Sequence, residues 1–277
     1  MNRWKQYAWP LSMFLLFEGI AITLWQALDN WFYLFNFTYI GGFLALGLLL
    51  YTKKFKYARL VVQFGVGLYM LVYLGLICNE NMQIEGFWYY LFLGVFEAAT
   101  IHYAVAKLFG PLLFGRGWCG YACWTAMILD LLPYKRPKGP RKPIGFLRYV
   151  TFTLSLLFVS ALFLFHVPNL ERVMFWSFLI GNGLYYASGA LLAFLCRDNR
   201  AFCKYLCPVT VFLKPASYFS LLRVKVDSKA CISCGTCKRV CPMEVDVTDP
   251  SRKRRNGTEC ILCMNCVESC PTKAVHL

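Results

Sequence analysis

Two cysteine runs near the end of the 277-residue chain constrain its folding more than any other feature. Each run reads C-x2-C-x2-C-x3-C-P, the bacterial iron–sulfur pattern in which the fourth cysteine serves the other cluster. The two runs must therefore fold against each other and exchange their last cysteines. This crossed ligation predicts one [4Fe-4S] cluster held by Cys231, Cys234, Cys237 and Cys270, and a second held by Cys241, Cys260, Cys263 and Cys266.

Zinc and disulfide bonds are the competing explanations for so many cysteines. A C-x2-C pair alone often marks zinc, which needs only four thiolates. Zinc does not explain a C-x2-C-x2-C repeat followed by C-P that occurs twice. Disulfide frameworks belong to small secreted domains, whereas the loop charges described below place these thiols in the cytoplasm. We therefore expect an α+β two-cluster ferredoxin-like domain over residues 223–277, which conducts single electrons.

The rest of the chain has the composition of a membrane protein. Hydrophobic residues make up 58% of the sequence and charged residues only 16%, against about 25% charged in soluble domains. A spanning helix needs about 20 apolar residues. Six segments qualify: residues 8–28, 31–51, 60–78, 86–109, 146–166 and 174–196. We expect a polytopic α-helical bundle over residues 1–198, which includes the first of two C-x3-C motifs, and an interfacial connector with the second motif over residues 199–222.

Loop charges predict how the bundle is oriented. One side of it carries nearly all the loop lysines and arginines: Arg3, Lys5, Lys53, Lys54, Lys56, Arg59, Lys135, Arg136, Lys138, Arg141, Lys142, Arg197 and Arg200. The other side carries Asp29, Glu80, Glu85 and Glu171, with Arg172 as its only basic residue. Basic loops stay in the cytoplasm, so both termini and the ferredoxin-like domain should be cytoplasmic. The net charge of +15 then reflects topology, and we expect no nucleic-acid partner.

Several shorter stretches have simple interpretations. The basic run Tyr134–Pro143 reads as a solvated, proline-stiffened loop with lipid headgroups as a secondary contact. Residues Pro208–Leu222 are amphipathic and should lie at the membrane surface. Val224 and Val226 alternate with polar residues and predict a short strand. Arg252–Arg255 reads as an exposed loop between the cysteine runs, with a docking patch for an acidic electron carrier as the alternative.

An internal repeat lies where two apolar segments end on the basic side. Residues 116–123 read R-G-W-C-G-Y-A-C, and residues 200–207 read R-A-F-C-K-Y-L-C. On a helix, C-x3-C spacing places two sulfurs on one face, one turn apart. Thiolates select iron–sulfur clusters or copper(I), and adjacent arginines favour the thiolate form. We expect one further redox or metal site here, with packing residues or a metal-free thiol pair as the alternatives. Its members would be Cys119, Cys123, Cys203, Cys207, Arg116 and Arg200.

Ionisable groups inside a bilayer are costly and usually functional. Glu18, Glu97 and His102 qualify by position. We predict that Glu97 and His102 accept the protons that a quinol releases on oxidation; the alternative is that each hydrogen-bonds to a neighbouring helix. Haem is not expected, because His102 and His166 lie toward opposite ends of their helices. NAD is not expected either, since no G-x-G-x-x-G follows a strand.

With six apolar segments, paired C-x3-C motifs and a double cluster pattern, the chain resembles the NapH/MauN-type membrane ferredoxin family, with NosR and CcoG proteins as more distant relatives. Family members carry C-x3-C-P, usually twice. The motif that ends at Cys207-Pro208 matches, whereas Trp124 follows Cys123 in the first motif. The chain begins directly at its first apolar segment, which favours the shorter NapH-like group. The resemblance implies electron exchange between quinone and a partner redox enzyme.

The leading hypothesis is an electron-transfer subunit of a quinol- or quinone-linked respiratory complex in a prokaryotic cytoplasmic (inner) membrane. Its expected partners are membrane lipid, quinone, and other subunits or a soluble electron carrier. A second hypothesis is a maturation protein that reduces copper or a disulfide at the C-x3-C thiols. A third is a structural anchor for a catalytic subunit.

Overall fold

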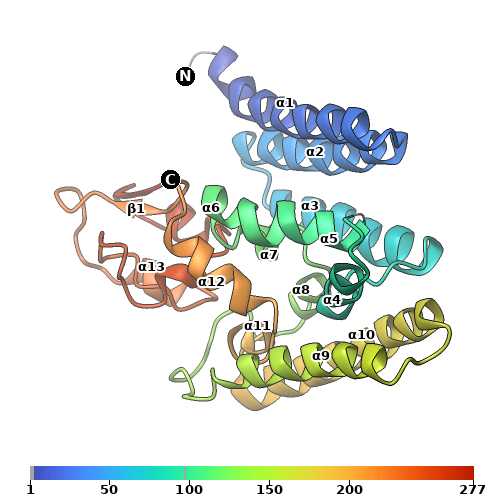
Figure 1. Ribbon diagram of the computed structural model, residues 1–277. Coiled ribbons are helices and arrows are strands. Elements are labelled where there is room, and N and C mark those ends of the chain that lie inside the picture. The colour runs from blue at the N-terminus through green and yellow to red at the C-terminus, as the bar shows by residue number, and fades with distance from the viewer. Residues whose placement is uncertain (1–2, 97) are drawn as a thin grey trace.

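Long apolar helices run side by side in the computed structural model, which describes residues 3–96 and 98–277 (Figure 1). Because lipid offers no hydrogen bonds, a chain that crosses it satisfies its backbone internally, as a helix does. Among the described residues, five helices are long and apolar enough to cross a membrane. They are α1 (Arg3–Leu28), α2 (Trp31–Thr52), α3 (Ala58–Leu68) with its π-helical continuation η1 (Tyr69–Ile77), α9 (Leu147–Leu164) and α10 (Leu170–Cys196).

The predicted fourth span, residues 86–109, is not one helix. Helix α4 (Ile84–Leu93) ends at Gly94, whose φ of 70° places it in the left-handed region where glycine closes helices. The chain then resumes as α5 (Ala98–Tyr103), η2 (Ala104–Phe109) and α6 (Gly110–Phe114). The prediction of a single helix here was wrong, although a mostly helical bundle with about six spans is confirmed. Glu97 lies outside the described residues.

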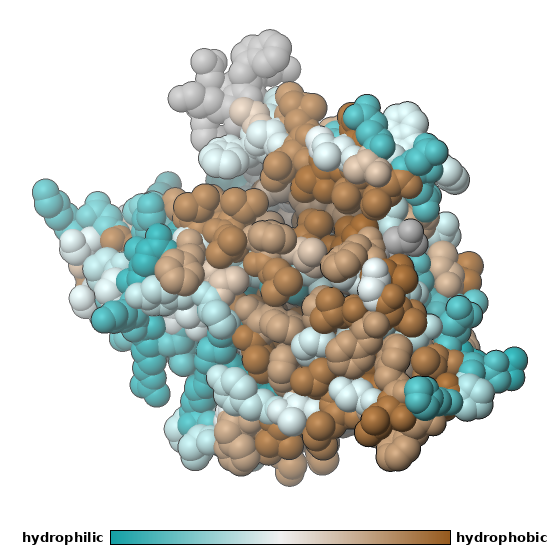
Figure 2. Space-filling view, viewed as in Figure 1, coloured by the Kyte–Doolittle hydropathy of each residue, from teal (hydrophilic) through white to brown (hydrophobic). Residues whose placement is uncertain are grey.

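The outer surface of the bundle is apolar, and its ends are polar. Figure 2 shows a band of hydrophobic side chains across the helices, with hydrophilic residues on the ferredoxin domain and at the opposite ends of the helices.

Close helix contacts fix the packing inside. A Cβ on Gly75 of η1 would lie 2.3 Å from the ring of Phe178, so glycine lets η1 and α10 approach each other.

Four short helices cap the bundle at the end where the ferredoxin domain lies: α7 (Gly117–Tyr121), α8 (Trp124–Leu129), α11 (Ala201–Tyr205) and α12 (Thr210–Tyr218). Helix α12 of the connector contacts α6, η2 and α9 of the bundle and η3 of the ferredoxin domain. Leu213 of α12 is fully buried. The connector therefore lies between the two parts of the molecule.

The C-terminal domain has short elements joined by long loops. Strand β1 (Lys225–Val226), close to the predicted strand, pairs antiparallel with β2 (Val275–His276). Helices α13 (Thr236–Arg239) and α14 (Asn265–Glu268) each lie within a cysteine run and contain its third cysteine, and η3 (Gly257–Glu259) precedes the second run. Helix α1 begins at the same end of the bundle as this domain (Figure 1).

Candidate functional site

The second predicted ligand set gathers around one cavity. Cys241, from the first run, lines it together with Cys260, Cys263 and Cys266. Apolar side chains such as Val224 complete the lining. Burial and the neighbouring thiolates, Cys241 among them, raise the pKa of Cys263 to about 11 and that of Cys266 to about 12. Soft thiols in an apolar hollow are the donor set that an iron–sulfur cluster takes.

The first predicted set lies nearer to solvent. The charge of Cys270, from the second run, acts to raise the pKa of Cys234. The charges of Cys231 and Cys234 act in the same way on the pKa of Cys237. The Thr236 hydroxyl lies 3.4 Å from the Cys234 sulfur, and hydrogen bonds from this residue lower the pKa of the thiol. Cys234 is exposed. Cys234 of the first run and Cys270 of the second are therefore neighbours, while the assignment of the eight cysteines to two clusters stays a prediction.

The two runs share an unusual backbone. Both place residues in the left-handed conformation at matching positions, which bends each loop around its thiols: Ser233 and Leu262, Gly235 and Met264, Glu244 and Lys273. Such conformations are costly for residues other than glycine and persist where the surroundings fix them, often at functional sites. In the described part of the chain, the two ferredoxin runs included, no three His, Cys, Asp or Glu side chains converge as they would around a single ion.

The two C-x3-C motifs face each other through reciprocal arginine contacts. Arg116 of the first motif donates to the Cys203 carbonyl of the second, at 3.2 Å. Arg200 of the second motif donates to the Cys119 carbonyl of the first, at 3.0 Å. Both guanidinium groups are fully buried. The sequence repeat therefore has a matching repeat of contacts, which gathers all four thiols on one side of the ferredoxin domain.

The helical reasoning behind the C-x3-C site was wrong in detail. Helix α7 ends before Cys123, which adopts an extended conformation, and α11 ends before Cys207. The arginines also do not favour the thiolate as expected, because burial outweighs them and raises the pKa of Cys203 to about 12 and that of Cys207 to about 11. Without a bound metal these thiols stay protonated, and metal coordination is what deprotonates such groups.

Two further ionisable side chains lie beside the first motif. The Lys107 ammonium group is 5.1 Å from the centroid of the Trp118 ring, and the His102 ring lies 5.3 Å from the same ring. Both side chains are buried, and His102 Nε2 has no hydrogen-bond partner among the described residues. Lys107 also lowers the pKa of Cys123, although burial dominates and raises it. The sequence analysis identified His102 but missed Lys107. A lysine inside an apolar segment was the signal that could have revealed it.

Asp130, which directly follows α8, supports the site, and the sequence analysis missed it. Its carboxylate accepts from Arg200 Nε at 2.8 Å and pairs with Arg59 at 2.8 Å. Burial opposes ionisation, but these two arginines hold the pKa of Asp130 below its usual value. Arg200 is therefore oriented by a fixed negative charge. No sequence pattern links residues that lie 70 positions apart.

The first C-x3-C motif lies directly against the second cysteine run. The Tyr121 hydroxyl donates to the Leu262 carbonyl at 2.9 Å. A Cβ on Gly120 would lie 2.4 Å from the Ile261 carbonyl oxygen, so only glycine allows this approach. Residues 261 and 262 lie between Cys260 and Cys263. The membrane thiols and the second ligand set are therefore neighbours.

Glu259 forms ion pairs with several cations where the first C-x3-C motif meets the second cysteine run. Its carboxylate, 1% exposed, pairs with Arg141 at 2.6 Å and with Arg148 at 3.2 Å. Lys214 of α12 lies 3.3 Å away and Arg116 of the first motif 4.0 Å away. Burial opposes ionisation, but these cations lower the pKa of Glu259 to about 2. Most residues of the basic loop Tyr134–Pro143 are exposed, as expected, but Arg141 packs onto the ferredoxin domain.

Two family profiles match these regions. A profile described as a 4Fe-4S dicluster domain matches residues 223–271. A profile described as a 4Fe-4S binding domain matches residues 101–143 and again residues 183–227, so each match contains one C-x3-C motif. The second profile thus matches the two halves of the internal repeat.

Three curated relatives extend over most of the chain. An uncharacterized protein of Methanocaldococcus jannaschii is 26% identical over 66% of this chain and 84% of its own length. The ferredoxin-type protein NapH of Haemophilus influenzae is 28% identical over 61% of this chain and 64% of its own length. The methylamine utilization ferredoxin-type protein MauN of Methylobacillus flagellatus is 26% identical over 70% of this chain and 77% of its own length. No solved structure matches the chain.

The helical bundle, the cysteine sets and these relatives define the class: a multi-pass membrane iron–sulfur electron-transfer protein. Within that class, the chain is similar to the NapH and MauN ferredoxin-type proteins, at 26–32% identity.

Proposed function

We propose that the chain passes electrons between the quinone pool and a partner redox enzyme, with the four C-x3-C cysteines as its redox site in the membrane. The contact of Gly120 and Tyr121 with Ile261 and Leu262 carries this proposal, because it brings the C-x3-C motif against the second cysteine set. The first set, with its exposed Cys234, faces solvent. The proposed order runs from the C-x3-C thiols to the second set and then to the first, where a partner can dock.

Under this proposal, Cys231, Cys234, Cys237 and Cys270 hold one [4Fe-4S] cluster, and Cys241, Cys260, Cys263 and Cys266 hold the other. When bound, such clusters supply one-electron transfer. The chain's own residues surround the thiols with apolar side chains and fix the loops around them. Cys119, Cys123, Cys203 and Cys207 would hold a further cluster or metal, with Arg116, Arg200 and Lys107 offsetting the thiolate charge. The profile matches over both motifs support iron–sulfur at this position.

Quinol oxidation needs a proton acceptor close to the redox site. His102 fits that role, since it is buried within van der Waals range of Trp118 and its Nε2 makes no hydrogen bond in the described part of the chain. Glu97, outside the described residues, remains in the proposal with it. We also propose that both termini and the ferredoxin domain are cytoplasmic, since the basic loops gather at that end.

A copper or disulfide reductase acting at the C-x3-C thiols is the rival function. Thiol exchange needs an accessible thiolate. Cys119 and Cys203 are only 7% and 6% exposed, and burial keeps Cys203 protonated. These observations favour a closed redox site over an exchange site. Copper bound stoichiometrically to the C-x3-C thiols of purified protein would support the rival.

Paired cysteine variants test the ligand assignment. Cys234→Ser should cost one cluster, or about four irons per chain, because it removes one of four ligands. Adding Cys270→Ser should cost no more, because crossed ligation assigns both residues to the same cluster. Combining Cys234→Ser with Cys241→Ser should cost both clusters. Iron analysis and EPR after anaerobic purification measure the result.

Two findings would contradict the assignment. One is a Cys234→Ser/Cys270→Ser protein that has lost both clusters, as uncrossed runs would predict. The other is a Cys234→Ser/Cys241→Ser protein that keeps one. Membrane insertion should be unchanged in all three variants, which serves as the internal control for folding.

A further inference from the structure

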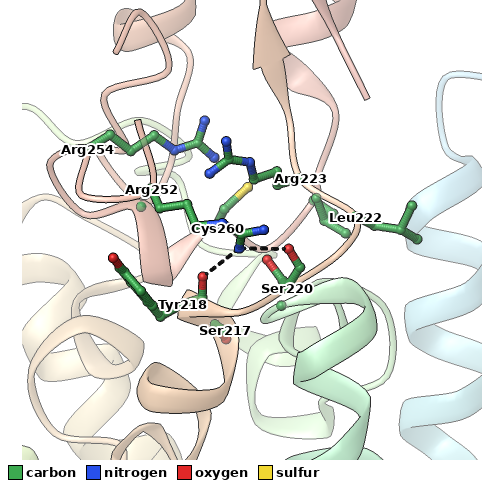
Figure 3. A pocket seen from close by; sticks show the side chains of 11 residues that line it. Ser217, Tyr218, Ser220, Leu222, Arg223, Arg252, Arg254 and Cys260 are labelled. Carbon is green, nitrogen blue, oxygen red and sulfur yellow. Dashed lines mark hydrogen bonds between the residues drawn. The ribbon is translucent and has the colours of Figure 1, made fainter. Parts of the chain in front are cut away.

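A small pocket at the seam between the bundle and the ferredoxin domain has basic walls (Figure 3). Arg223 reaches it from the end of the connector, while Arg252 and Arg254 reach it from the loop between the two cysteine runs. Tyr218 and Ser220, at the end of α12, form the opposite wall. The figure shows the three arginine side chains gathered on one side of this hollow. None of these residues has a role in the proposed electron transfer.

Backbone carbonyl groups hold each arginine in place. Arg252 donates to the carbonyls of Tyr218 at 2.9 Å and Ser220 at 3.3 Å. Arg254 donates to the Val224 carbonyl at 2.7 Å, and Arg223 donates to the Pro250 carbonyl at 3.1 Å. A guanidinium group has five N–H donors. These contacts orient the three groups and leave donors free to bind an anion.

The positive charge of this cluster has no carboxylate to balance it. Within residues 3–96 and 98–277, none of the three arginines lies within ion-pair distance of Asp or Glu, whereas Glu259 alone has four cations. Arg254 is 6% exposed, and buried charges are normally paired. Burial and the charges of Arg252 and Arg254 lower the pKa of Arg223, which shows how close the three lie. Burial raises the pKa of the Cys260 thiol, and Arg254 acts in the opposite direction.

Apolar side chains adjoin the pocket on the bundle side. The connector residues Leu221 and Leu222 donate backbone hydrogen bonds to Leu112 at 2.9 Å and Leu113 at 2.7 Å, at the end of α6. Leu221 is 69% exposed and Phe219 is 63% exposed. Exposed apolar side chains at the end of a membrane helix lie at the depth of lipid headgroups and upper acyl chains.

We propose that Arg223, Arg252 and Arg254 bind the phosphate of an anionic phospholipid, with its acyl chains along Phe219 and Leu221. Guanidinium groups match phosphate in a bidentate geometry, and basic pockets beside membrane helices bind anionic headgroups. A free phosphate ion could bind the same arginines, but it would make no contact with the adjoining apolar side chains. A bound lipid would hold the second cysteine run against the membrane surface, because Arg252 and Arg254 belong to the loop that precedes it.

Native mass spectrometry of the full chain in detergent tests this proposal. Delipidated protein is titrated with phosphatidylglycerol, and separately with phosphatidylcholine of the same chain lengths or with inorganic phosphate. The test variant is Arg223→Gln/Arg252→Gln. The matched control is Lys253→Gln/Arg255→Gln, which removes two charges from the same loop but not from the pocket lining. Unchanged iron content and cluster absorbance establish that each variant is folded.

The proposal expects the wild type and the control to retain phosphatidylglycerol equally, and the test variant to lose at least tenfold in affinity. Phosphatidylcholine should bind equally weakly to all three proteins. Arg223→Gln alone, which removes one carbonyl contact, should show an intermediate loss if the double variant proves unstable. Equal retention by the test and control variants would overturn the proposal. So would displacement of the lipid by inorganic phosphate at equimolar concentration, which would indicate a site for the free anion.

Discussion

At the residue scale, a single carboxylate connects the two parts of the molecule. Glu259 directly precedes Cys260, a member of the second predicted set. It pairs with Arg116, Arg141, Arg148 and Lys214. One partner comes from the first C-x3-C motif, and the others come from the basic loop, α9 and α12. Such a buried carboxylate both orients its partners and holds four elements at one point.

Glu259→Gln should therefore loosen the attachment of the ferredoxin domain. Removing one partner of a buried ion pair typically costs about 3–5 kcal/mol, because the remaining charges stay buried without compensation. We expect a lower thermal transition in detergent and faster loss of iron on exposure to a chelator. Glu268→Gln, which neutralises an exposed carboxylate on α14, is the matched control. Equal transitions for the two variants would contradict the role of Glu259.

Sequence reasoning succeeded at this scale where the chemistry is local. The spacing of eight cysteines predicted two sets, and the structure places Cys241 of the first run around one cavity with Cys260, Cys263 and Cys266 of the second. The contacts of Glu259, Asp130 and Lys107 were not predictable, because their partners are distant in the chain and form only on folding. The effect of burial on Cys203 was missed for the same reason, since spacing carries no information about solvent.

At the element scale, short helices rather than long ones build the site. Helices α7 and α11 each end before the second cysteine of their motif, so the motif is a turn that folds toward its counterpart. This geometry leaves the backbone at Gly120 open to the loop at Ile261. The first C-x3-C motif and the second cysteine run therefore meet through the backbone at Gly120 and Ile261, beside the hydrogen bond from the Tyr121 hydroxyl to the Leu262 carbonyl.

Gly120→Ala should disturb this contact specifically. Its Cβ would lie 2.4 Å from the Ile261 carbonyl oxygen, and a backbone atom cannot move aside as a flexible side chain can. Overpacking of this kind typically costs about 1–3 kcal/mol. We expect a lower thermal transition and slower reduction of the ferredoxin clusters by quinol. Gly183→Ala in α10, where a Cβ meets nothing within 4 Å, is the control and should match the wild type in both measurements. A Gly120→Ala protein that is reduced at the wild-type rate would contradict the contact's role.

Element boundaries show what an apolar pattern can and cannot reveal. Long apolar runs predicted most spans correctly, because any such run must be helical in lipid. The run over residues 86–109 is equally apolar, yet Gly94 breaks it by adopting a positive φ. Mean hydropathy over a window is not changed by one glycine with a positive φ. A broken pair of helices inside the bundle and a single spanning helix therefore look alike in sequence.

At the scale of the whole molecule, one end of the bundle carries every candidate redox group. The two C-x3-C motifs, the connector and the ferredoxin domain lie at the end where α1 also begins (Figure 1). The apolar band separates this end from hydrophilic side chains at the other end of the helices (Figure 2). This polarity is what the positive-inside rule predicts for a cytoplasmic ferredoxin domain.

Reporter fusions test that orientation. Alkaline phosphatase, active only outside the cytoplasm, should be inactive when fused after Leu277 and active when inserted in the loop before Leu170. A fluorescent protein that matures in the cytoplasm should give the opposite pattern. An active phosphatase at the C-terminus would place the clusters outside the cell and contradict the proposed topology.

The central claim is that electrons reach the ferredoxin domain through the four membrane cysteines, and quinol reduction measures it most directly. Anaerobic protein is mixed with quinol, and bleaching of cluster absorbance is followed in the wild type and in a variant with Cys119, Cys123, Cys203 and Cys207 all changed to serine. The account predicts rapid bleaching in the wild type. In the variant, it predicts that the eight-iron ferredoxin domain remains assembled but stays oxidised. A variant that bleaches at the wild-type rate would contradict the account.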